Sequence, residues 1–294
     1  MRAFAWFLLL LAAALAVVAV FTWPAWLLLH PHFDFPFHRI GERIGMLALA
    51  AGFLLVARHL KLADRASLGY GAPRPLFVRE MLIGLGLGAA TMLAVVAGMS
   101  ALGLLDWSRA AAMSAGALAR LPVATLASGL AVAFIEESFV RGAMYTAIQR
   151  ESGARTAVLL TSVCYAASHF FGKVRIAPED VTPWSGVALL GQSLQAFAHF
   201  SGIVDAFLAL TAVGVVLALV RQATGNIAAC LGLHAGWVWV MLVAHELSAP
   251  RRDAPLGFLL SRFDGFVGWL VLGWTLLLAV PLWRFYAGRA TRST

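Results

Sequence analysis

Long hydrophobic runs make up most of the chain, and polar positions are confined to short stretches between them. Runs long enough to span a bilayer lie at residues 4–29, 43–60, 80–104, 120–147, 155–171, 203–220, 226–246 and 265–286. Because a helix of about 20 apolar residues crosses the hydrocarbon core, each run predicts a spanning helix. The pattern therefore predicts an all-α, polytopic transmembrane helical bundle of about eight spanning helices, with residues 1–294 forming a single integral membrane domain.

The segment between the fifth and sixth runs has a different pattern. Residues 173–202 begin with the polar and proline-containing stretch around Pro178 and Pro183, followed by WSGVALLGQSLQAFAHF. This second part alternates apolar and polar positions at helical spacing. It predicts a loop followed by a re-entrant or interfacial helix, rather than a ninth span.

Composition agrees with a membrane protein. The chain is 61% hydrophobic and 12% charged, against about 25% charged residues in soluble domains. Its net charge of +8 is scattered over short loops, with no basic stripe, which argues against a nucleic-acid partner and leaves the lipid bilayer as the expected environment. The run at 4–29 is too long for a cleaved signal peptide and predicts a retained helix.

Loop charges indicate the orientation. The loop between the second and third runs is the richest in cations, which are Arg58, Lys61, Arg65, Arg74 and Arg79. The positive-inside bias places this loop, and with it both termini, in the cytoplasm. Arg221 is counted with the cytoplasmic cations. Frequent Ala, Arg and Leu are typical of a high-GC bacterium, so the expected location is a bacterial inner membrane.

Gly84 and Gly88 form a GxxxG pattern in the third run. Such a pattern lets two helix backbones approach closely in a membrane. Packing inside the bundle and a seam for a homo-oligomer both fit this pattern.

Ionisable residues inside the runs are few, and they are the main functional signal. They are Glu136, Glu137, Arg141, His169, Asp205 and His234. Such residues are costly at membrane depth and usually face a protein interior or a wet cavity.

The three charged residues of EESFVR do not all lie on one face of a helix. In a helix, Glu137 and Arg141 lie at i and i+4 with the acid first, the favourable order for an ion pair. Glu136 is rotated by about 100° from Glu137, so it is free for proton transfer. A purely structural ion-pair cluster fits these three residues equally well.

Two histidines favour the functional interpretation. Counted along their helices from the cytoplasmic side, Glu136 and His169 lie at similar depth and His234 lies somewhat nearer that side, so the three can meet in one cavity. A Glu/His/His pocket in low dielectric can activate water, because the glutamate takes its proton and an imidazole holds the water or stabilises an oxyanion.

Other candidates are weaker. Cys230 lies at i−4 from His234, which permits a thiolate pair, but no third orienting group is in reach on that helix and a buried, inert cysteine is favoured. Asp205 fits a charge near a helix N-terminus. We expect His199, His245 and Glu246 outside the site.

These motifs resemble those of a known family, the CPBP intramembrane proteases, which include the type II CAAX prenyl endopeptidases and the Abi-like proteins. EESFVR resembles the motif EExxxR, YAASH resembles FxxxH with Tyr165 in place of Phe, and LHAGWV resembles HxxxN/D. The resemblance covers roughly residues 120–246, which would form the catalytic core. It implies an intramembrane endopeptidase that hydrolyses a membrane-associated protein or peptide with glutamate-activated water. By position, Glu136, His169 and His234 would be catalytic and Glu137 and Arg141 would support them.

Two positions depart from the family pattern. Tyr165, a pocket candidate, keeps the aromatic ring. Val238, the other pocket candidate, stands where the family has Asn or Asp to stabilise the oxyanion, and it offers no donor. A catalytically silent membrane scaffold therefore stays open. A proton-coupled transporter is a further alternative, although the inverted repeats it predicts are not found.

A metal ion is the remaining open point. Glu136, His169 and His234 are residue types that ligate zinc, but the HExxH spacing is missing. We favour a metal-free glutamate mechanism without a cofactor, and the sequence does not identify the substrate.

Overall fold

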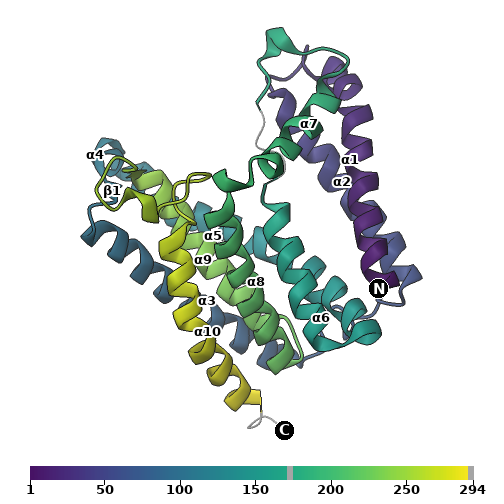
Figure 1. Cartoon of the computed structure of the whole chain (residues 1–294), viewed down its shortest axis with the longest axis vertical. Coiled ribbons are helices and arrows are strands. Elements are labelled where there is room, and N and C mark those ends of the chain that lie inside the picture. Colours follow the sequence, from purple (N-terminus) through teal and green to yellow (C-terminus); the bar gives the residue numbers. More distant parts are fainter. Residues whose placement is uncertain (171–174, 291–294) are drawn as a thin grey trace. The chain divides into compact units, whose positions relative to one another are not determined.

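A computed structural model describes residues 1–170 and 175–290, and almost all of its regular structure is helical (Figure 1). The all-α polytopic fold predicted from the sequence is confirmed. The described chain divides into two compact units. The first unit comprises residues 1–63 and 166–203, and the second comprises residues 64–165 and 204–294. The single membrane domain stays a prediction, and each unit is described by itself.

The first unit is built on α1 (Arg2–Leu29), which packs against α2 (Phe37–His59) and α7 (Ser185–Ala198). The short 3-10 helices η2 (Pro178–Asp180) and η3 (Phe200–Gly202) flank α7. A Cβ on Gly186 would lie 2.2 Å from the Ala19 carbonyl oxygen, so glycine is needed where α7 meets α1. The predicted loop and short helix are therefore present, while residues 173 and 174 of that segment lie outside the described residues. The depth of α7 in a bilayer stays a prediction.

The second unit contains the remaining long helices. They are α3 (Arg74–Ala101), α5 (Ala115–Glu137), the π-helix η1 (Ser138–Met144), most of α6 (Tyr145–Ser168), α8 (Val204–Thr224), α9 (Ala228–Leu247) and α10 (Trp269–Ala290). Short elements are β1 (Leu105–Asp106), α4 (Ser108–Ala112), β2 (Ala249–Pro250) and η4 (Gly257–Leu259). The β1 and β2 strands pair antiparallel, with Leu105 opposite Pro250, a small exception to the helical pattern that the sequence analysis missed.

Among the described residues, seven helices are long and apolar enough to span a membrane, against the eight that the sequence predicts. The difference lies in residues 115–168, which form one helical run of 54 residues. Gly153 interrupts this run with φ 83° and ψ 166°, in the gap between the predicted spans 120–147 and 155–171, the last residue of which lies outside the described residues. At 1.5 Å per residue the run measures about 80 Å, more than twice the thickness of a hydrocarbon core. It is therefore long enough for two crossings with a reversal at Gly153.

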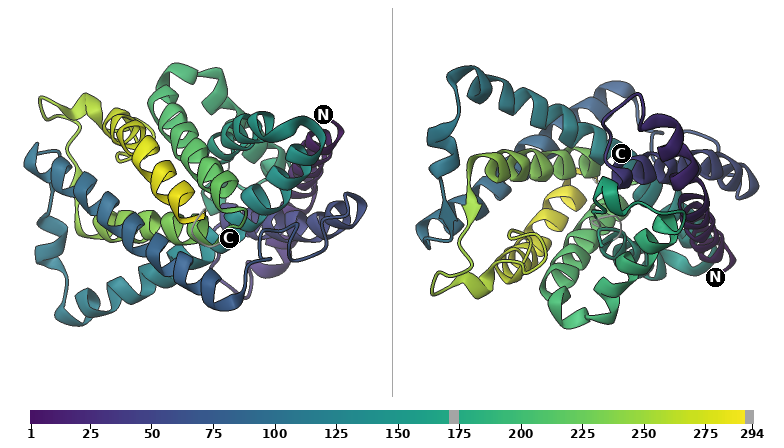
Figure 2. Two further views of the ribbon diagram at one scale, coloured as in Figure 1. Left: turned by 90° about the horizontal axis from the view of Figure 1, so that it is seen from below. Right: turned by 90° about the horizontal axis from the view of Figure 1, so that it is seen from above.

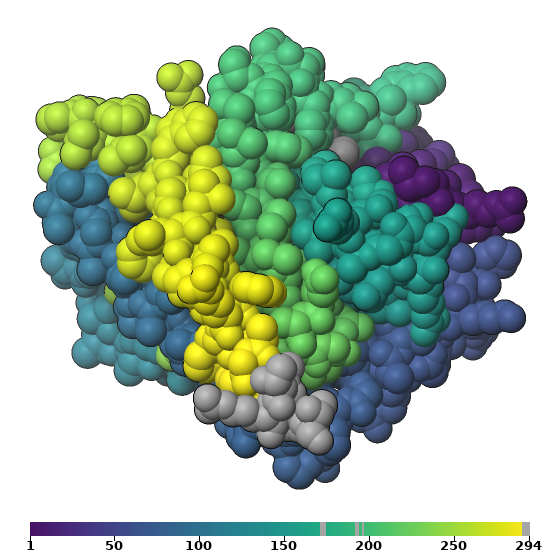
Figure 3. Space-filling view, turned by 60° about the horizontal axis from the view of Figure 1, so that its bottom comes forward, coloured from purple at the N-terminus to yellow at the C-terminus, as the bar shows by residue number. Residues whose placement is uncertain are grey.

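Helix α9 forms the centre of the second unit. It packs against α3, α5 and α8, and Figure 2 shows α3 and α9 crossing closely. Helix α10 packs against α8, and the space-filling view shows it between α8 and α3 (Figure 3). Apolar side chains of α8, α9 and α10 form one core cluster around Leu217, Leu233 and Tyr286.

Glycines allow α9 to approach α3. A Cβ on Gly232 would lie 2.0 Å from the Met81 carbonyl oxygen, and one on Gly236 would lie 2.5 Å from that of Leu85. From the other side, Gly84 and Gly88 face the α9 backbone. The GxxxG of α3 therefore packs inside the unit, the first of the two roles that the sequence left open. A homo-oligomer stays a prediction, but the GxxxG motif is not available as its interface because α9 covers it.

Candidate active site

The charged motif lies where α5 changes into a π-helix. Glu136 and Glu137 are the last residues of α5, and Arg141 lies within η1. π-helices are rare, occur mostly as single turns inside α-helices and are frequent at functional sites. A Cβ on Gly142 would lie 2.6 Å from the Leu68 carbonyl oxygen, so glycine lets the loop that precedes α3 pack directly onto η1.

A second contact ties this loop to the π-helix. The Ser138 hydroxyl donates to the Phe134 carbonyl, so the Tyr70 hydroxyl is the donor in its 2.5 Å hydrogen bond to Ser138 Oγ. Burial raises the pKa of Tyr70, which keeps the phenol protonated and able to donate. The loop and η1 therefore form one packed substructure next to Glu137.

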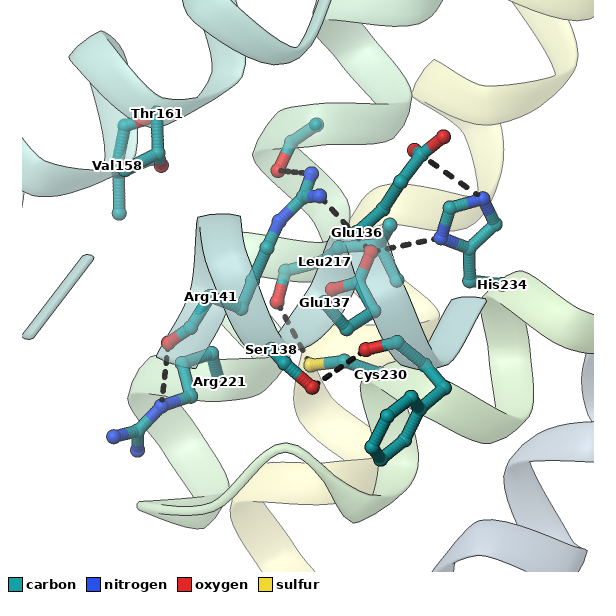
Figure 4. Close-up of polar contacts among 12 residues, drawn as sticks. Glu136, Glu137, Ser138, Arg141, Val158, Thr161, Leu217, Arg221, Cys230 and His234 are labelled. Carbon is teal, nitrogen blue, oxygen red and sulfur yellow. Dashed lines mark hydrogen bonds and ion pairs between the residues drawn. The ribbon is translucent and has the colours of Figure 1, made fainter. Parts of the chain in front are cut away.

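Glu137 contacts two other residues of the site, Arg141 and His234 (Figure 4). Its Oε1 accepts from Arg141 Nη1 at 3.0 Å and lies 2.8 Å from His234 Nδ1. Arg141 also donates to the Gly214 carbonyl oxygen at 3.3 Å. Glu137 and Arg141 are both fully buried, where an ion without a partner would cost several kcal/mol. The pair is thus linked to three helices, α5, α8 and α9.

Glu136 is placed differently from its neighbour. Its side chain is 32% exposed, and its Oε2 lies 3.9 Å from His234 Nε2. Within the described part of the chain, Oε2 has no hydrogen-bond partner. A separation of 3.9 Å is too long for a direct hydrogen bond, but it suits two groups that share one water. The geometry thus leaves Glu136 available, while Glu137 is engaged.

The two pocket candidates differ in how closely they contact the site. The Tyr165 ring packs edge-on against the His234 ring, with centroids 5.9 Å apart. The Arg141 guanidinium carbon lies 4.4 Å from the centroid of the Tyr165 ring. Val238 lies one turn after His234 and is half-buried. Its hydrocarbon side chain brings no donor to that position.

His169 lies in a different compact unit from the other candidate residues. It follows the last residue of α6 and belongs to the first unit, whereas Glu136, Glu137, Arg141 and His234 belong to the second. Its convergence with Glu136 and His234, and its catalytic role, stay predictions.

The weaker candidates have other partners. Cys230 is fully buried, and its thiol donates to the Leu217 carbonyl oxygen at 3.2 Å, as expected for an inert cysteine. Asp205 lies in the first turn of α8 and accepts from the Arg262 backbone N–H. His245 packs against Phe266, and His199 follows α7 in the first unit.

Arg221 also contributes to the site, which its place in the sequence does not indicate. Its position predicts a loop cation, yet it is only 6% exposed and its Nε donates to the Arg141 carbonyl oxygen at 3.1 Å. Arg221 directly follows the apolar run of α8. An arginine that leaves the membrane and one that folds back into the bundle have the same sequence pattern there, so no signal identified it.

No metal centre is assembled in the part of the chain that the structure describes. Within residues 1–170 and 175–290, no group of three His, Cys, Asp or Glu side chains is arranged to hold a metal ion. Glu136 and His234 would contribute two of the three zinc ligands considered from the sequence. Zinc binding and the metal-free mechanism both stay predictions.

Comparison with known proteins identifies the region that contains this site. Residues 118–240 match the family model described as Type II CAAX prenyl endopeptidase Rce1-like. The match covers the three motifs and nearly coincides with the catalytic core predicted at 120–246, so the family recognised from the motifs is confirmed for this segment. The curated proteins and the solved structures give no match.

Proposed function

We propose that this chain, with its Rce1-like core at residues 118–240, is an intramembrane endopeptidase that cleaves a membrane-associated protein or peptide. The observation that carries the proposal is the contrast between the two glutamates. Glu137 is held by Arg141 and His234, while Glu136 has an oxygen 3.9 Å from His234 Nε2 that no described residue hydrogen-bonds. This is the arrangement that a general base and its water need.

Glu137 sets the orientation of His234. An ionised carboxylate only accepts hydrogen bonds, so the hydrogen between His234 Nδ1 and Glu137 belongs to the imidazole. A neutral His234 then presents the lone pair of Nε2 toward Glu136. A water between them donates one hydrogen to Nε2 and the other to Glu136, which directs its oxygen lone pair at the substrate carbonyl.

The reaction then follows a general-base course. Glu136 takes a proton as the water oxygen bonds to the carbonyl carbon, which gives a tetrahedral oxyanion. When this collapses, the C–N bond breaks and the proton on Glu136 passes to the leaving amine. The products are a carboxylic acid and an amine, and Glu136 is a carboxylate again.

Glu136→Gln tests this mechanism. The amide keeps the shape and cannot take the proton, so we expect the loss of at least 100-fold in cleavage rate that removal of a general base typically causes. The measurement compares new peptide termini in membrane proteomes of cells that carry the wild type, the variant or no protein. Two matched peptides, one with a prenylated CAAX end and one unprenylated, then show with purified protein whether the substrate must be prenylated.

Glu246→Gln is the matched control, because Glu246 is an exposed glutamate near the end of α9. It should cleave like the wild type. Cleavage that persists in the Glu136 variant would refute the glutamate mechanism. Equal proteomes with and without the protein would refute proteolysis itself.

Val238 favours a second candidate, the silent scaffold, because it brings no oxyanion donor. One such donor is typically worth 100-fold or more in kcat. If the chain is a slow protease, Val238→Asn should raise the cleavage rate at least tenfold. A scaffold would stay inactive with Asn at this position.

A further inference from the structure

The π-helix leaves one of its carbonyl groups to a side chain. In an α-helix, the Tyr145 N–H would donate to the carbonyl oxygen four residues earlier, that of Arg141. Here it donates to the carbonyl oxygens of Val140 and Gly142. The Arg141 carbonyl oxygen instead accepts from Arg221 Nε at 3.1 Å, as the close-up shows (Figure 4).

Arg221 reaches this carbonyl from α8 through the buried interior. It is 6% exposed, and its Nη2 also donates to Thr146 Oγ1 at 3.4 Å. The guanidinium carbon lies 5.7 Å from the centroid of the Tyr145 ring. One side chain therefore contacts both sides of the junction between η1 and α6. The planar fork of donors in arginine suits this task better than the single ammonium of lysine.

We propose that Arg221 is a positioning residue that holds η1 in the π-helical register and thereby keeps Arg141, Glu137 and His234 in place. A π-helical turn contains one residue more than an α-helical turn. If the Arg141 carbonyl returned to the Tyr145 N–H, the residues after it would rotate by about 100° relative to α5. The Arg141 side chain could keep its i,i+4 pair with Glu137, but it would lose the hydrogen bond to the Gly214 carbonyl oxygen of α8 that fixes the position of the pair.

The hydrogen bond between His234 Nδ1 and Glu137 reports this geometry without any substrate. In full-length protein in lipid nanodiscs, with ¹⁵N-labelled histidine, the shared proton gives a downfield imidazole resonance that His234→Gln assigns by its loss. We expect Arg221→Met to remove or shift this resonance. Arg221→Lys should shift it less, because an ammonium can still donate to the Arg141 carbonyl oxygen, although it lacks the planar fork that fixes the direction of the arginine donors. Thr146→Val, which removes only the longer bond, should leave it in place.

The second measurement is the kcat and KM of peptide cleavage, and this test rests on the proposed function. A displacement of about 1 Å can cost 100-fold in rate, so we expect Arg221→Met to lower kcat about 100-fold with KM nearly unchanged. Arg221→Lys should lower it about tenfold, and Thr146→Val by less than twofold. The substrate is the one found in the proteome comparison.

The outcomes separate the two proposals. A wild-type resonance and kcat in folded Arg221→Met would overturn the positioning role, even if cleavage depends on Glu136. A shifted resonance in a protein that cleaves nothing would support the positioning role and refute the protease. If Arg221→Met does not fold, Arg221→Lys decides, and wild-type values in both measurements there would overturn the role.

Discussion

Helices α1 and α9 differ in how apolar they are and in how much of their surface the protein buries. The most apolar window of α1 has a mean hydropathy of 2.8 and is 22% buried, whereas that of α9 has a mean hydropathy of 1.5 and is 61% buried. The more hydrophobic helix is therefore the less buried one, the reverse of a soluble protein. Lipid chains are as apolar as leucine, so hydrophobicity alone does not draw helices together inside a bilayer.

What α9 has instead is small residues and polar partners. Gly232 and Gly236 bring its backbone against that of α3, and His234 between them bonds Glu137 of α5. Where α1 meets α2, packing relies on side chains: a Cβ on Gly52 of α2 would meet the flexible end of Leu10, at 2.3 Å. The contact between α9 and α3 therefore leaves less room for change than the contact between α1 and α2.

The largest effect should come from Gly232→Leu. A side chain there collides with the Met81 carbonyl oxygen at 2.0 Å and with the backbone of Leu85, so α3 and α9 must separate. Overpacking alone costs about 1–3 kcal/mol, and loss of the backbone approach adds to it. We expect no monodisperse protein in size-exclusion chromatography after detergent extraction.

Gly86→Leu is the matched control. Gly86 lies on α3 between Gly84 and Gly88, is exposed, and has nothing within 4 Å of its Cβ position. It should behave like the wild type. Gly52→Ala in α2 should also be tolerated, because Leu10 can move. Equal loss in all three variants would contradict the difference between the two regions.

The next largest effect should come from Glu137→Gln. The change leaves Arg141 fully buried without its charged partner, and breaking a buried ion pair typically costs 3–5 kcal/mol. Glu136→Gln, one residue away and 32% exposed, should change the free energy of unfolding by less than about 0.5 kcal/mol. Unfolding in a denaturant series, followed by tryptophan fluorescence in detergent, measures both.

The double variant Glu137→Gln/Arg141→Met sharpens this test. Removing both charges removes the uncompensated cation, so the pair should be less destabilising than Glu137→Gln alone. Additive effects would mean that the two side chains do not stabilise each other. Equal destabilisation by the Glu136 and Glu137 variants would contradict the division of roles between them.

The sequence predicted the fold well because the bilayer imposes a single dominant rule, namely long apolar helices. Even the kink at Gly153 falls in the predicted gap between two runs. The i,i+4 rule also indicated the contact of Glu137 with Arg141. It could not indicate that η1 is a π-helix, since register depends on tertiary partners such as Arg221 and the Leu68 carbonyl. For the same reason the bond from His234 to Glu137 was missed: it depends on how α9 rotates against α5.

The smallest effect should come from Asp64, which lies outside the spanning helices. The Ser67 hydroxyl and backbone N–H both donate to its carboxylate, and Arg150 donates to the Ser67 hydroxyl at 2.6 Å. These hydrogen bonds from Ser67 lower the pKa of Asp64. A carboxyl whose folded pKa is lowered adds stability above its ordinary pKa and loses it as the pH falls through the folded value. Asp64→Asn should therefore melt slightly below the wild type at neutral pH in detergent, and the difference should vanish once the pH falls below the lowered pKa of Asp64 in the folded protein. Because the carboxylate is fully solvated, we expect the smallest change of the series, and a loss as large as that of Glu137→Gln would contradict the ranking of buried over exposed charges.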